Sequence, residues 1–470
     1  MPSISSENRT LQRISTIMET TEAVKPKKRK APPIFYIFLI GLSCLLLPRF
    51  LANFKSGSGS GSLGNRLLIS EKVTPDKKKG IEAFAKGDYQ QAIASFKQSL
   101  LQQPNDPETL IYFNNAQAGN NGLKIAVSVP IGSNLNVAQE ILRGVASAQD
   151  EINQNGGIKG QKLLVLIVND KNDPEIARKL AQELVNEQQV LGVLGHNSSD
   201  ASLAAAPIYQ KGGLVMISAT SSANNLSGFG SYIFRTVPAT NVMAEALADY
   251  ALKTARKTKI AFCYDSQTPS NVSFKDEFLA ALVNKGGQLV PTVCDLSAPN
   301  FNPSTAVTQA ISSGADGLFI SSHIDRIESA IALARANQGK LALFSSPTLY
   351  TVKTLQAGQQ DVKGLALAAP WHPQVNPPFA QKMNQQWRGK VSWRTATAYD
   401  ATQAMIAGLQ QSQNREGLQQ ALHSQGFTVG GASGAVRFAN SGDRISQPVI
   451  VQVQSKGFNY DFVMLPTTAP

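Results

Sequence analysis

Residues 190–222 read VLGVLGHNSSDASLAAAPIYQKGGLVMISATSS. Two short apolar runs within it, Val190–Leu194 and Leu214–Ile217, have the character of strands buried on both faces. A helical segment, Asp200–Gln210, lies between them and is stopped by two glycines. Each strand is followed by residues rich in Ser and Thr. This order predicts one unit of a parallel sheet, and the remaining chain is organised around it.

The polar residues after these two strands predict a ligand site. In an open parallel sheet, ligands bind at the carboxyl ends of strands, where helix N-termini present free N–H groups. The hydroxyl groups of Ser199 and Ser222 add hydrogen-bond donors without adding charge, which suits a small anionic group such as an α-carboxylate. Either serine alone would be an ordinary helix N-cap. Two successive polar turns favour a binding cleft.

Strand-like and helix-like segments alternate from Leu123 onward, which predicts βαβ crossovers and parallel sheets covered by helices on both faces. The strands are too many for one small sheet, and a break near Phe234–Asn241 predicts two lobes. The predicted strands are 124–129, 162–168, 190–194, 214–217, 259–264, 289–294, 317–320, 341–344 and 364–369. The predicted helices are 137–155, 175–187, 244–254, 274–284, 303–312 and 327–336.

The composition describes a globular chain with more than one domain. The chain has 470 residues, of which 42% are hydrophobic and 16% charged, and such a length predicts two or three domains. Half of the net charge of +12 falls in residues 1–55. The remainder is too dilute for a nucleic-acid surface, so no nucleic-acid partner is predicted.

Neither a metal site nor an active site is predicted. The four histidines and three cysteines lack metal-ligand spacing, and no GxSxG, Walker or HExxH motif occurs. His196 precedes two serines, but nothing in the sequence marks an acidic partner for it. The sequence therefore predicts no enzyme, no catalytic residue and no cofactor. Cys263 and Cys294 fall on consecutive predicted strands, and either a disulfide or two buried thiols fits them.

The N-terminal region predicts a membrane anchor. Residues 1–30 form a polar tail with five positive charges at its end, for which we expect disorder on the cytoplasmic side. Residues 31–50 contain an uncharged run long enough to span a bilayer. A cleaved signal peptide and a lipoprotein signal around Cys44 are the alternatives, but the basic tail is long and the apolar run continues past the cysteine. Residues 51–75, rich in Gly and Ser, predict a flexible linker.

Residues 76–120 predict a small helical segment. Two apolar helical faces lie on either side of a Gly-Asp-Tyr turn, and the pattern resembles a tetratricopeptide repeat. The matching positions are Gly80, Gly87, Tyr89, Ala92, Phe96 and Pro104. Because such repeats bind peptides only when several are stacked, we expect a spacer or a cap on the next domain.

Several motifs between Leu123 and Gly457 resemble those of a known family. They are Glu140–Gly160 (EILRGVASAQDEINQNGGIKG), Val168–Asp170, Tyr232–Thr236, Ala398–Ala401 and Gly434–Phe438 followed by Gly442-Asp443. Their order and content resemble the type I periplasmic solute-binding proteins, in particular the branched-chain amino acid and amide binding proteins of ABC transporters.

The resemblance implies a two-lobed α/β fold with two doubly wound parallel sheets, joined by a hinge of three strands. Lobe 1 would comprise residues 123–238 and about 370–427, and lobe 2 residues 239–369 and about 428–466. A small polar solute would bind between the lobes and pass to an ABC permease. With the predicted anchor, the protein would span the bacterial inner membrane once and place this domain in the periplasm.

The same resemblance implies site residues on both lobes. In lobe 1, Ser198 or Ser199 together with Thr220 and Ser222 would hold a carboxylate. In lobe 2, the family's two acidic residues for an ammonium fall on Thr240 and Thr348. The position of its pocket aromatic falls on Pro269, beside Ser270.

The loss of both acids makes the usual binding of an amino acid unexpected, because a buried ammonium requires a counter-charge. Either another acid, such as Asp265 or Asp325, substitutes, or the ligand has no ammonium; urea-like amides, carboxylates or no ligand remain open. Trp371 and His372 are either cleft residues or hinge packing. The alternatives to transport are a ligand-sensing receptor module and a ligand-free scaffold or activator in the cell envelope.

Overall fold

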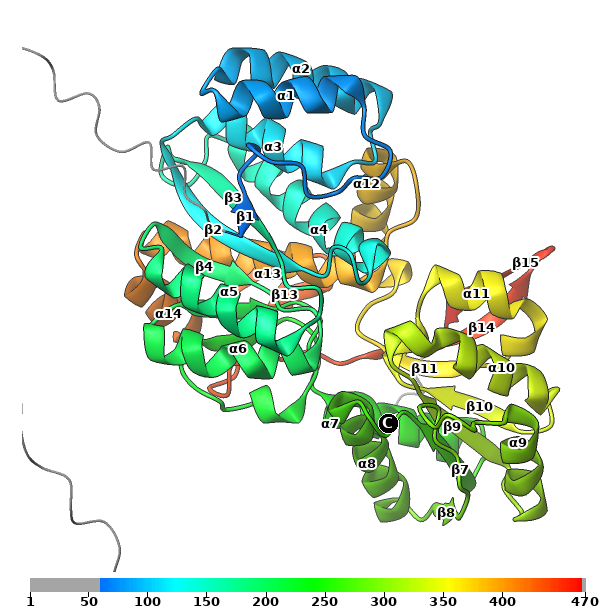
Figure 1. Ribbon diagram of the computed structural model, residues 1–470. Helices are drawn as coiled ribbons and strands as arrows, with labels where there is room; N and C mark the ends of the chain where they lie inside the picture. The colour runs from blue at the N-terminus through cyan, green and yellow to red at the C-terminus, as the bar shows by residue number, and fades with distance from the viewer. Residues whose placement is uncertain (1–59, 467–470) are drawn as a thin grey trace, which may run out of the picture. The chain divides into compact units, whose positions relative to one another are not determined.

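The computed structural model describes residues 60–466, which form two α/β lobes preceded by three helices (Figure 1). The predicted tail (1–30) and membrane anchor (31–50) lie outside these residues. Within the described range, no helix is both long and apolar enough to cross a bilayer.

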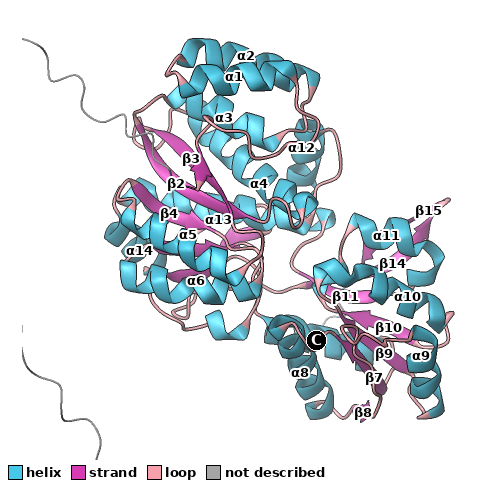
Figure 2. Ribbon diagram, viewed as in Figure 1, coloured by secondary structure: helices cyan, strands magenta, loops and turns pink. Residues whose placement is uncertain are grey.

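The first lobe contains a six-stranded sheet in the order β1-β3-β2-β4-β5-β6. Its strands are β1 (Gly61–Ser62), β2 (Gly122–Val129), β3 (Lys162–Asn169), β4 (Val190–Leu194), β5 (Val215–Ser218) and β6 (Ile233–Arg235). All pairs are parallel except β1 with β3, which are antiparallel. The parallel strands are apolar on both faces because helices cover both (Figure 2).

The helices of the first lobe come from distant parts of the chain. On one face, α13 (Trp393–Gln411) packs between α4 (Leu135–Gln154) and α14 (Arg415–His423). On the other, α5 (Pro174–Asn186) packs against α6 (Ser199–Gly212). Gly144 allows the close approach of α4 to α13, because a Cβ there would lie 2.3 Å from the Thr395 carbonyl oxygen.

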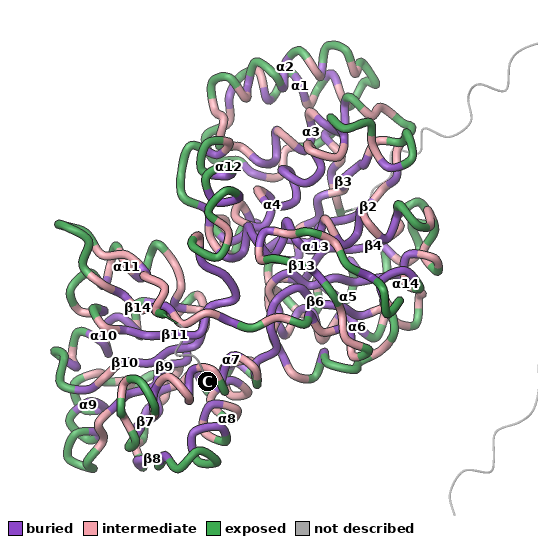
Figure 3. The backbone as a smooth tube through the Cα atoms, turned by 180° about the vertical axis from the view of Figure 1, so that it is seen from behind, coloured by how far each residue is buried: buried purple, intermediate pink, exposed green. Residues whose placement is uncertain are grey.

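The second lobe contains a seven-stranded sheet in the order β15-β14-β11-β10-β9-β7-β8. Its strands are β7 (Lys259–Tyr264), β8 (Gln288–Val290), β9 (Gly317–Ser321), β10 (Ala342–Ser345), β11 (Ala366–Ala369), β14 (Val449–Lys456) and β15 (Asn459–Met464). One face is covered by α7 (Thr240–Asp249) and α8 (Pro269–Asn284) through stacked phenylalanines. The other is covered by α9 (Pro303–Ser312), α10 (Ile327–Asn337) and α11 (Val352–Gly358). Figure 3 shows the central strands of both sheets as buried segments, whereas β8 and β15 at the edges of the second sheet are mostly exposed or half-buried.

The two-lobed α/β fold is confirmed, with three differences from the expectation. First, the second sheet is mixed, because β14 and β15 are antiparallel to their neighbours. Second, β8 ends at Val290 rather than at residue 294, since Pro291 has no N–H for the ladder.

Third, residues 428–446 pack on lobe 1, not on lobe 2. The hairpin of β12 (Val429–Gly431) and β13 (Gly434–Val436) contacts α13, and Ala432 and Val436 are buried in the lobe 1 core. The return to lobe 2 therefore comes just before β14.

The three N-terminal helices are α1 (Pro75–Ala85), α2 (Tyr89–Gln102) and α3 (Pro107–Ala118). Helices α1 and α2 form the predicted hairpin, in which Gly80 leaves room for the Phe96 ring. Ile111 and Tyr112 of α3 extend the lobe 1 core, and the segment therefore caps lobe 1. Its likeness to a tetratricopeptide repeat remains a prediction.

The described part of the predicted linker, residues 60–75, is instead attached to lobe 1. Strand β1 pairs with Val168 and Ile167 on the edge of the sheet. Farther along that edge, Asn115 of α3 donates to the carbonyl oxygen of Val165 (2.8 Å) and accepts from its N–H (3.0 Å). An otherwise open sheet edge is thus covered.

Candidate functional site

A cavity of about 110 Å³ lies between the lobes and is lined by residues of both. Its lobe 1 wall is formed by the loops after β4 and β5 and by the start of α13. Its lobe 2 wall is formed by the first turn of α8 and by the loops after β9 and β10. The cavity therefore lies at the carboxyl ends of strands, as predicted for parallel sheets.

Six of the seven predicted ligand residues line this cavity: Ser198, Ser199, Thr220, Ser222, Ser270 and Thr348. The seventh, Thr240, does not. Its hydroxyl donates to the Ser222 carbonyl oxygen (2.7 Å) and lies 3.0 Å from the Ser222 hydroxyl. Thr240 therefore stabilises the loop that contains Ser222 without lining the cavity itself.

Hydrogen bonds within the protein fix the polar loops of lobe 1. The Ser198 hydroxyl caps α6 by accepting from the Ala201 N–H (3.2 Å). Thr220 Oγ1 donates to the Asn197 carbonyl oxygen (2.8 Å), which joins the two loops. Ser221 donates to the Ser199 hydroxyl oxygen (3.1 Å), so the Ser199 proton remains available for another acceptor.

A buried polar cluster lies under these loops. His196 Nδ1 lies 2.7 Å from Asp170 Oδ2 and 3.0 Å from Ser128 Oγ, and its Nε2 lies 3.1 Å from the Tyr209 hydroxyl. Burial raises the pKa of Asp170, but the hydrogen bond and charge of His196 outweigh this effect, and the pKa lies below its ordinary value.

No feature of the sequence marks Asp170 as the acidic partner of His196. Ser128, Asp170 and His196 are nevertheless fully buried, and none of them lines the interlobe cavity. The cluster therefore supports the loop between β4 and α6 and is not exposed to a substrate. The carbonyl oxygen of His196 accepts from Ser202 (3.1 Å) and Ser218 (2.9 Å), which continues this support.

The lobe 2 wall contains polar groups without partners. Asn271 Oδ1 lies 3.4 Å from the Ser321 hydroxyl, whereas Asn271 Nδ2 has no hydrogen-bond partner. Ser346 Oγ also has none. The two residues are only 5% and 2% exposed. A buried polar group without a partner is costly, so a ligand is the natural partner for both.

Neither predicted substitute acid lines the cavity. Asp265 is fully buried and is paired with Arg326. The Asp325 side chain is 57% exposed and lies 3.4 Å from His323. The expectation that one of them replaces the missing acids is therefore wrong for this cavity.

Sequence reasoning missed three lining residues with strong chemistry. Arg394 is 3.4 Å from Glu140 and lies over the ring of Trp393, 4.4 Å from its centre. Trp393 is 4% exposed, and its Nε1 has no partner. Asp200 lies in the first turn of α6; burial raises its pKa, and the nearby charge of His323 opposes this. An adjacent Trp and Arg at a helix start was a signal that could have been noticed.

Trp371 and His372 belong to the hinge packing. The Trp371 Nε1 donates to the Ala432 carbonyl oxygen (3.1 Å), and His372 Nε2 lies 3.0 Å from the Phe462 carbonyl oxygen. Neither residue lines the cavity of about 110 Å³, but His372 lines a second cavity, of about 340 Å³, to which Glu140 of lobe 1 and Tyr350 of lobe 2 also contribute. Both instead join the strand end at β11 to later segments of the chain.

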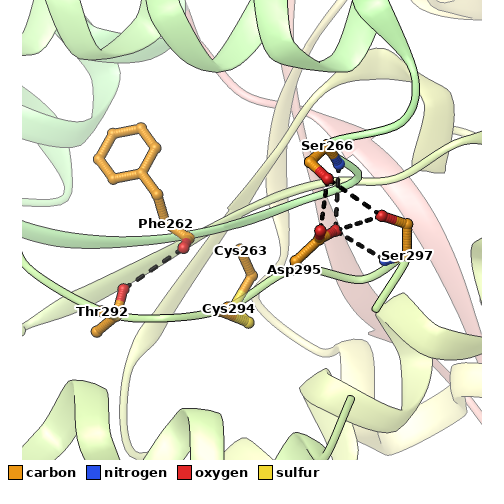
Figure 4. Close-up of a disulfide and its surroundings, with 7 residues drawn as sticks. All are labelled: Phe262, Cys263, Ser266, Thr292, Cys294, Asp295 and Ser297. Atoms are coloured by element: carbon orange, nitrogen blue, oxygen red, sulfur yellow. Dashed lines mark hydrogen bonds between the residues drawn. A yellow bond between two sulfur atoms is a disulfide. The ribbon is translucent and has the colours of Figure 1, made fainter. Parts of the chain in front are cut away.

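Cys263 and Cys294 form a disulfide, with their Cα atoms 4.7 Å apart (Figure 4). Beside it, Asp295 accepts hydrogen bonds from the N–H groups of Ser266 (3.2 Å) and Ser297 (2.9 Å). Burial raises the pKa of Asp295, but the hydrogen bonds from Ser266 and Ser297 together outweigh it and lower the pKa to about 2. The disulfide and the Asp295 carboxylate together fix the loop that leads into α8. Residues 60–466 contain no group of three His, Cys, Asp or Glu that could hold a metal ion.

Comparison with known proteins places this architecture among binding proteins. A family model described as "Periplasmic binding protein" matches residues 122–458. The Leu/Ile/Val/Thr-binding protein of Salmonella typhimurium is 26% identical over 311 residues, which cover 64% of this chain and 82% of that protein. The Leu/Ile/Val-binding protein of Escherichia coli K12 is 28% identical over 280 residues, covering 57% and 74%.

A solved structure shows the same fold. The leucine binding protein of Thermotoga maritima superimposes with a TM-score of 0.64 at 19% identity, covering 73% of this chain and 99% of that one. The matched region coincides with the two lobes, and the three N-terminal helices precede the matched segment 122–458.

Proposed function

Because this chain belongs to the periplasmic binding protein family, whose members found here are solute-binding proteins and not enzymes, we propose that it captures a small acidic solute for an ABC transporter. The observation that carries the proposal is the interlobe cavity, lined by hydroxyl groups of Ser199, Thr220 and Ser222. The similarity to proteins named for binding Leu, Ile, Val and Thr supports a solute with a carboxylate.

The first wall is suited to that carboxylate. Helix α6 begins at Ser199, so its unpaired N–H groups and positive end favour an anion there. The hydrogen bonds between the loops hold Ser199 and Thr220 before any ligand arrives. A preorganised wall binds more tightly because little ordering remains to be done.

The second wall would close on the bound solute. Since both lobes line the cavity, a solute that contacts both favours the closed arrangement over an open one. An ABC permease would then distinguish loaded from empty protein by the arrangement of the lobes. Attachment to the inner membrane through residues 31–50, with the lobes in the periplasm, is part of this proposal.

The experiment is isothermal titration of the full-length protein with amino acids, 2-oxo acids, amides, urea and small dicarboxylates. We expect at least one carboxylate to bind. The double variant Ser199→Ala/Ser222→Ala should lose that binding, while Ser304→Ala/Ser313→Ala, at exposed positions of lobe 2, should retain it. A screen without any binding would contradict the proposal and favour a scaffold, and a loaded protein that never contacts a permease would favour a sensor.

A further inference from the structure

The lobe 2 side of the cavity has the chemistry of a hydrogen-bond donor, not of an anion. Asn271 Nδ2 can only donate, and Ser346 Oγ has a proton to give; both are without partners and more than nine-tenths buried. Trp393 Nε1, equally buried, adds a third unpartnered donor to the lining of the same cavity.

The orientation of the Asn271 amide follows from its neighbour. The Ser321 hydroxyl is 3.3 Å from the Asn271 carbonyl oxygen and 3.4 Å from Oδ1. With Oδ1 beside that hydroxyl, the amide nitrogen is the end left for a ligand. Asn271 and Ser270 lie in the first turn of α8, whose N-cap Thr268 makes no side-chain cap. In this turn Pro269 has no N–H, and the N–H groups of Asn271 and Val272 donate to the Thr268 carbonyl oxygen (3.0 and 3.2 Å). The Ser270 N–H is therefore the one backbone donor that this turn adds.

The charges of the cavity do not provide for an ammonium at this side. Among the described residues that line it, Asp200 is the one carboxylate. It belongs to lobe 1, where the N-terminus of α6 already favours its charge. Across from it lies the imidazole of His323. The positive charge of Arg394 is matched by Glu140.

We propose that the solute is a small carboxylic acid that carries no ammonium and whose second polar group accepts hydrogen bonds, as in a 2-oxo acid or a short dicarboxylate. This inference rests on the proposed function. The carboxylate would occupy the Ser199 and Thr220 side, and the second acceptor would take the hydrogens of Asn271, Ser346 and Trp393. An ammonium could donate to the Ser346 hydroxyl oxygen but would leave the donor-only nitrogens of Asn271 and Trp393 without partners.

The cavity volume sets a size for this solute. About 110 Å³ is available, and an engineered cavity of roughly 150 Å³ holds benzene. The solute is therefore small, with roughly six non-hydrogen atoms or fewer in this arrangement of the lobes. Pyruvate and alanine form a matched pair of about this size, and succinate and aspartate form a larger pair that tests the size limit. Each pair differs chiefly in the presence of an ammonium.

The test is isothermal titration of the full-length protein with these four compounds. We expect pyruvate or succinate to bind at least tenfold more tightly than its amino acid partner. Asn271→Asp should weaken the acid at least tenfold and narrow or reverse the preference. Asn284→Asp, at the exposed end of the same helix, should change neither. If Asn271→Asp does not fold, the relative affinities of the wild-type protein for each acid and its amino acid partner test the inference by themselves.

The outcomes separate this inference from the proposed function. Tighter binding of alanine or aspartate, or of any ammonium-bearing solute in the wider screen, overturns the inference and leaves solute binding intact. Binding of a neutral amide alone, with no acid bound, also overturns it. Failure of every compound in both experiments overturns the two together.

Discussion

The two walls of the interlobe cavity differ in how their polar groups are satisfied. On lobe 1, the protein itself supplies the partners: Thr220 holds the Asn197 carbonyl, and His196 rests on Asp170. On lobe 2, Asn271 and Ser346 stay buried without partners. The difference teaches that the Ser and Thr loops of lobe 1 are completed by folding, whereas Asn271 and Ser346 of lobe 2, together with Trp393 Nε1 at the start of α13, are left for a ligand. Five variants test this contrast.

The largest effect is expected from Asp170→Ala. This change leaves His196 buried without its partner, and breaking a buried pair in this way costs about 3–5 kcal/mol. Chemical denaturation should show the loss of stability. Asp276→Ala, at an exposed carboxylate of lobe 2, should change the free energy of unfolding by less than about 1 kcal/mol. Equal effects of the two substitutions would remove the claim that the lobe 1 loops depend on the buried cluster.

The same residue predicts a dependence on pH. The pKa of Asp170 is lower in the folded protein than in the unfolded chain, so its contribution is complete above about pH 4, the ordinary value for Asp. It is lost as the pH falls through the lower, folded value. Asp170→Asn should therefore show a weaker fall in stability below about pH 4 than the wild type. If wild type and variant lost stability equally below this pH, the lowered pKa of Asp170 would be contradicted.

The next effect concerns the disulfide under the lobe 2 loops. Cys263→Ser/Cys294→Ser opens a loop with a sequence separation of 31 residues, which costs about 3.7 kcal/mol in the chain-entropy account. Thermal unfolding should show the loss, and a reducing agent should reproduce it in the wild type only. A variant as stable as the wild type would show that hydrogen bonds to Asp295 suffice to hold this loop.

A smaller loss is expected from Thr220→Ala on lobe 1. The substitution removes the hydrogen bond to the Asn197 carbonyl oxygen and leaves that oxygen without the hydroxyl's proton, at a cost of about 1 kcal/mol. Denaturant titration without ligand measures it. No loss of stability would mean that the two loops are not joined by this bond in solution.

The smallest effect has the opposite sign. Ser346→Ala removes a buried hydroxyl that has no partner, so the unliganded protein should gain up to about 1 kcal/mol. The same variant should bind the solute more weakly. Loss of stability without ligand would show that Ser346 is already satisfied, and the contrast between the walls would then narrow to Asn271.

Much of the fold followed from local patterns. Buried parallel strands such as Val190–Leu194 are short apolar runs, and their ends matched closely. The pattern could not give the placement of residues 428–446, since the hairpin at Gly430 has weak hydrophobic periodicity and its side is decided by contacts with α13. Strand β1 could not be predicted from its sequence either, because its two residues form a strand only by pairing with the edge of β3.

The site residues could be predicted where polar side chains directly follow the end of a strand. Ser199, Thr220 and Ser222 follow strands directly, and they line the cavity. Trp393 and Arg394 begin a helix some 170 residues later and reach the cavity only because α13 packs on α4. Thr240 shows the opposite case. Its distance along the chain from the Tyr232–Thr236 motif predicted a ligand contact, but its hydroxyl donates to the Ser222 carbonyl oxygen instead.

The return of α13 to lobe 1 has a consequence during synthesis. When β6 leaves the ribosome, about 160 residues must still be added before Trp393 appears. At about 5–20 residues per second this takes roughly 8–32 s. Throughout that interval the nascent first lobe exposes the apolar face of α4 and of its sheet, which α13 will later cover. We therefore expect the half-made chain to require protection by a chaperone. The three N-terminal helices are complete before β2, and they can pack on lobe 1 as soon as strand β3, whose edge they cover, has been synthesised.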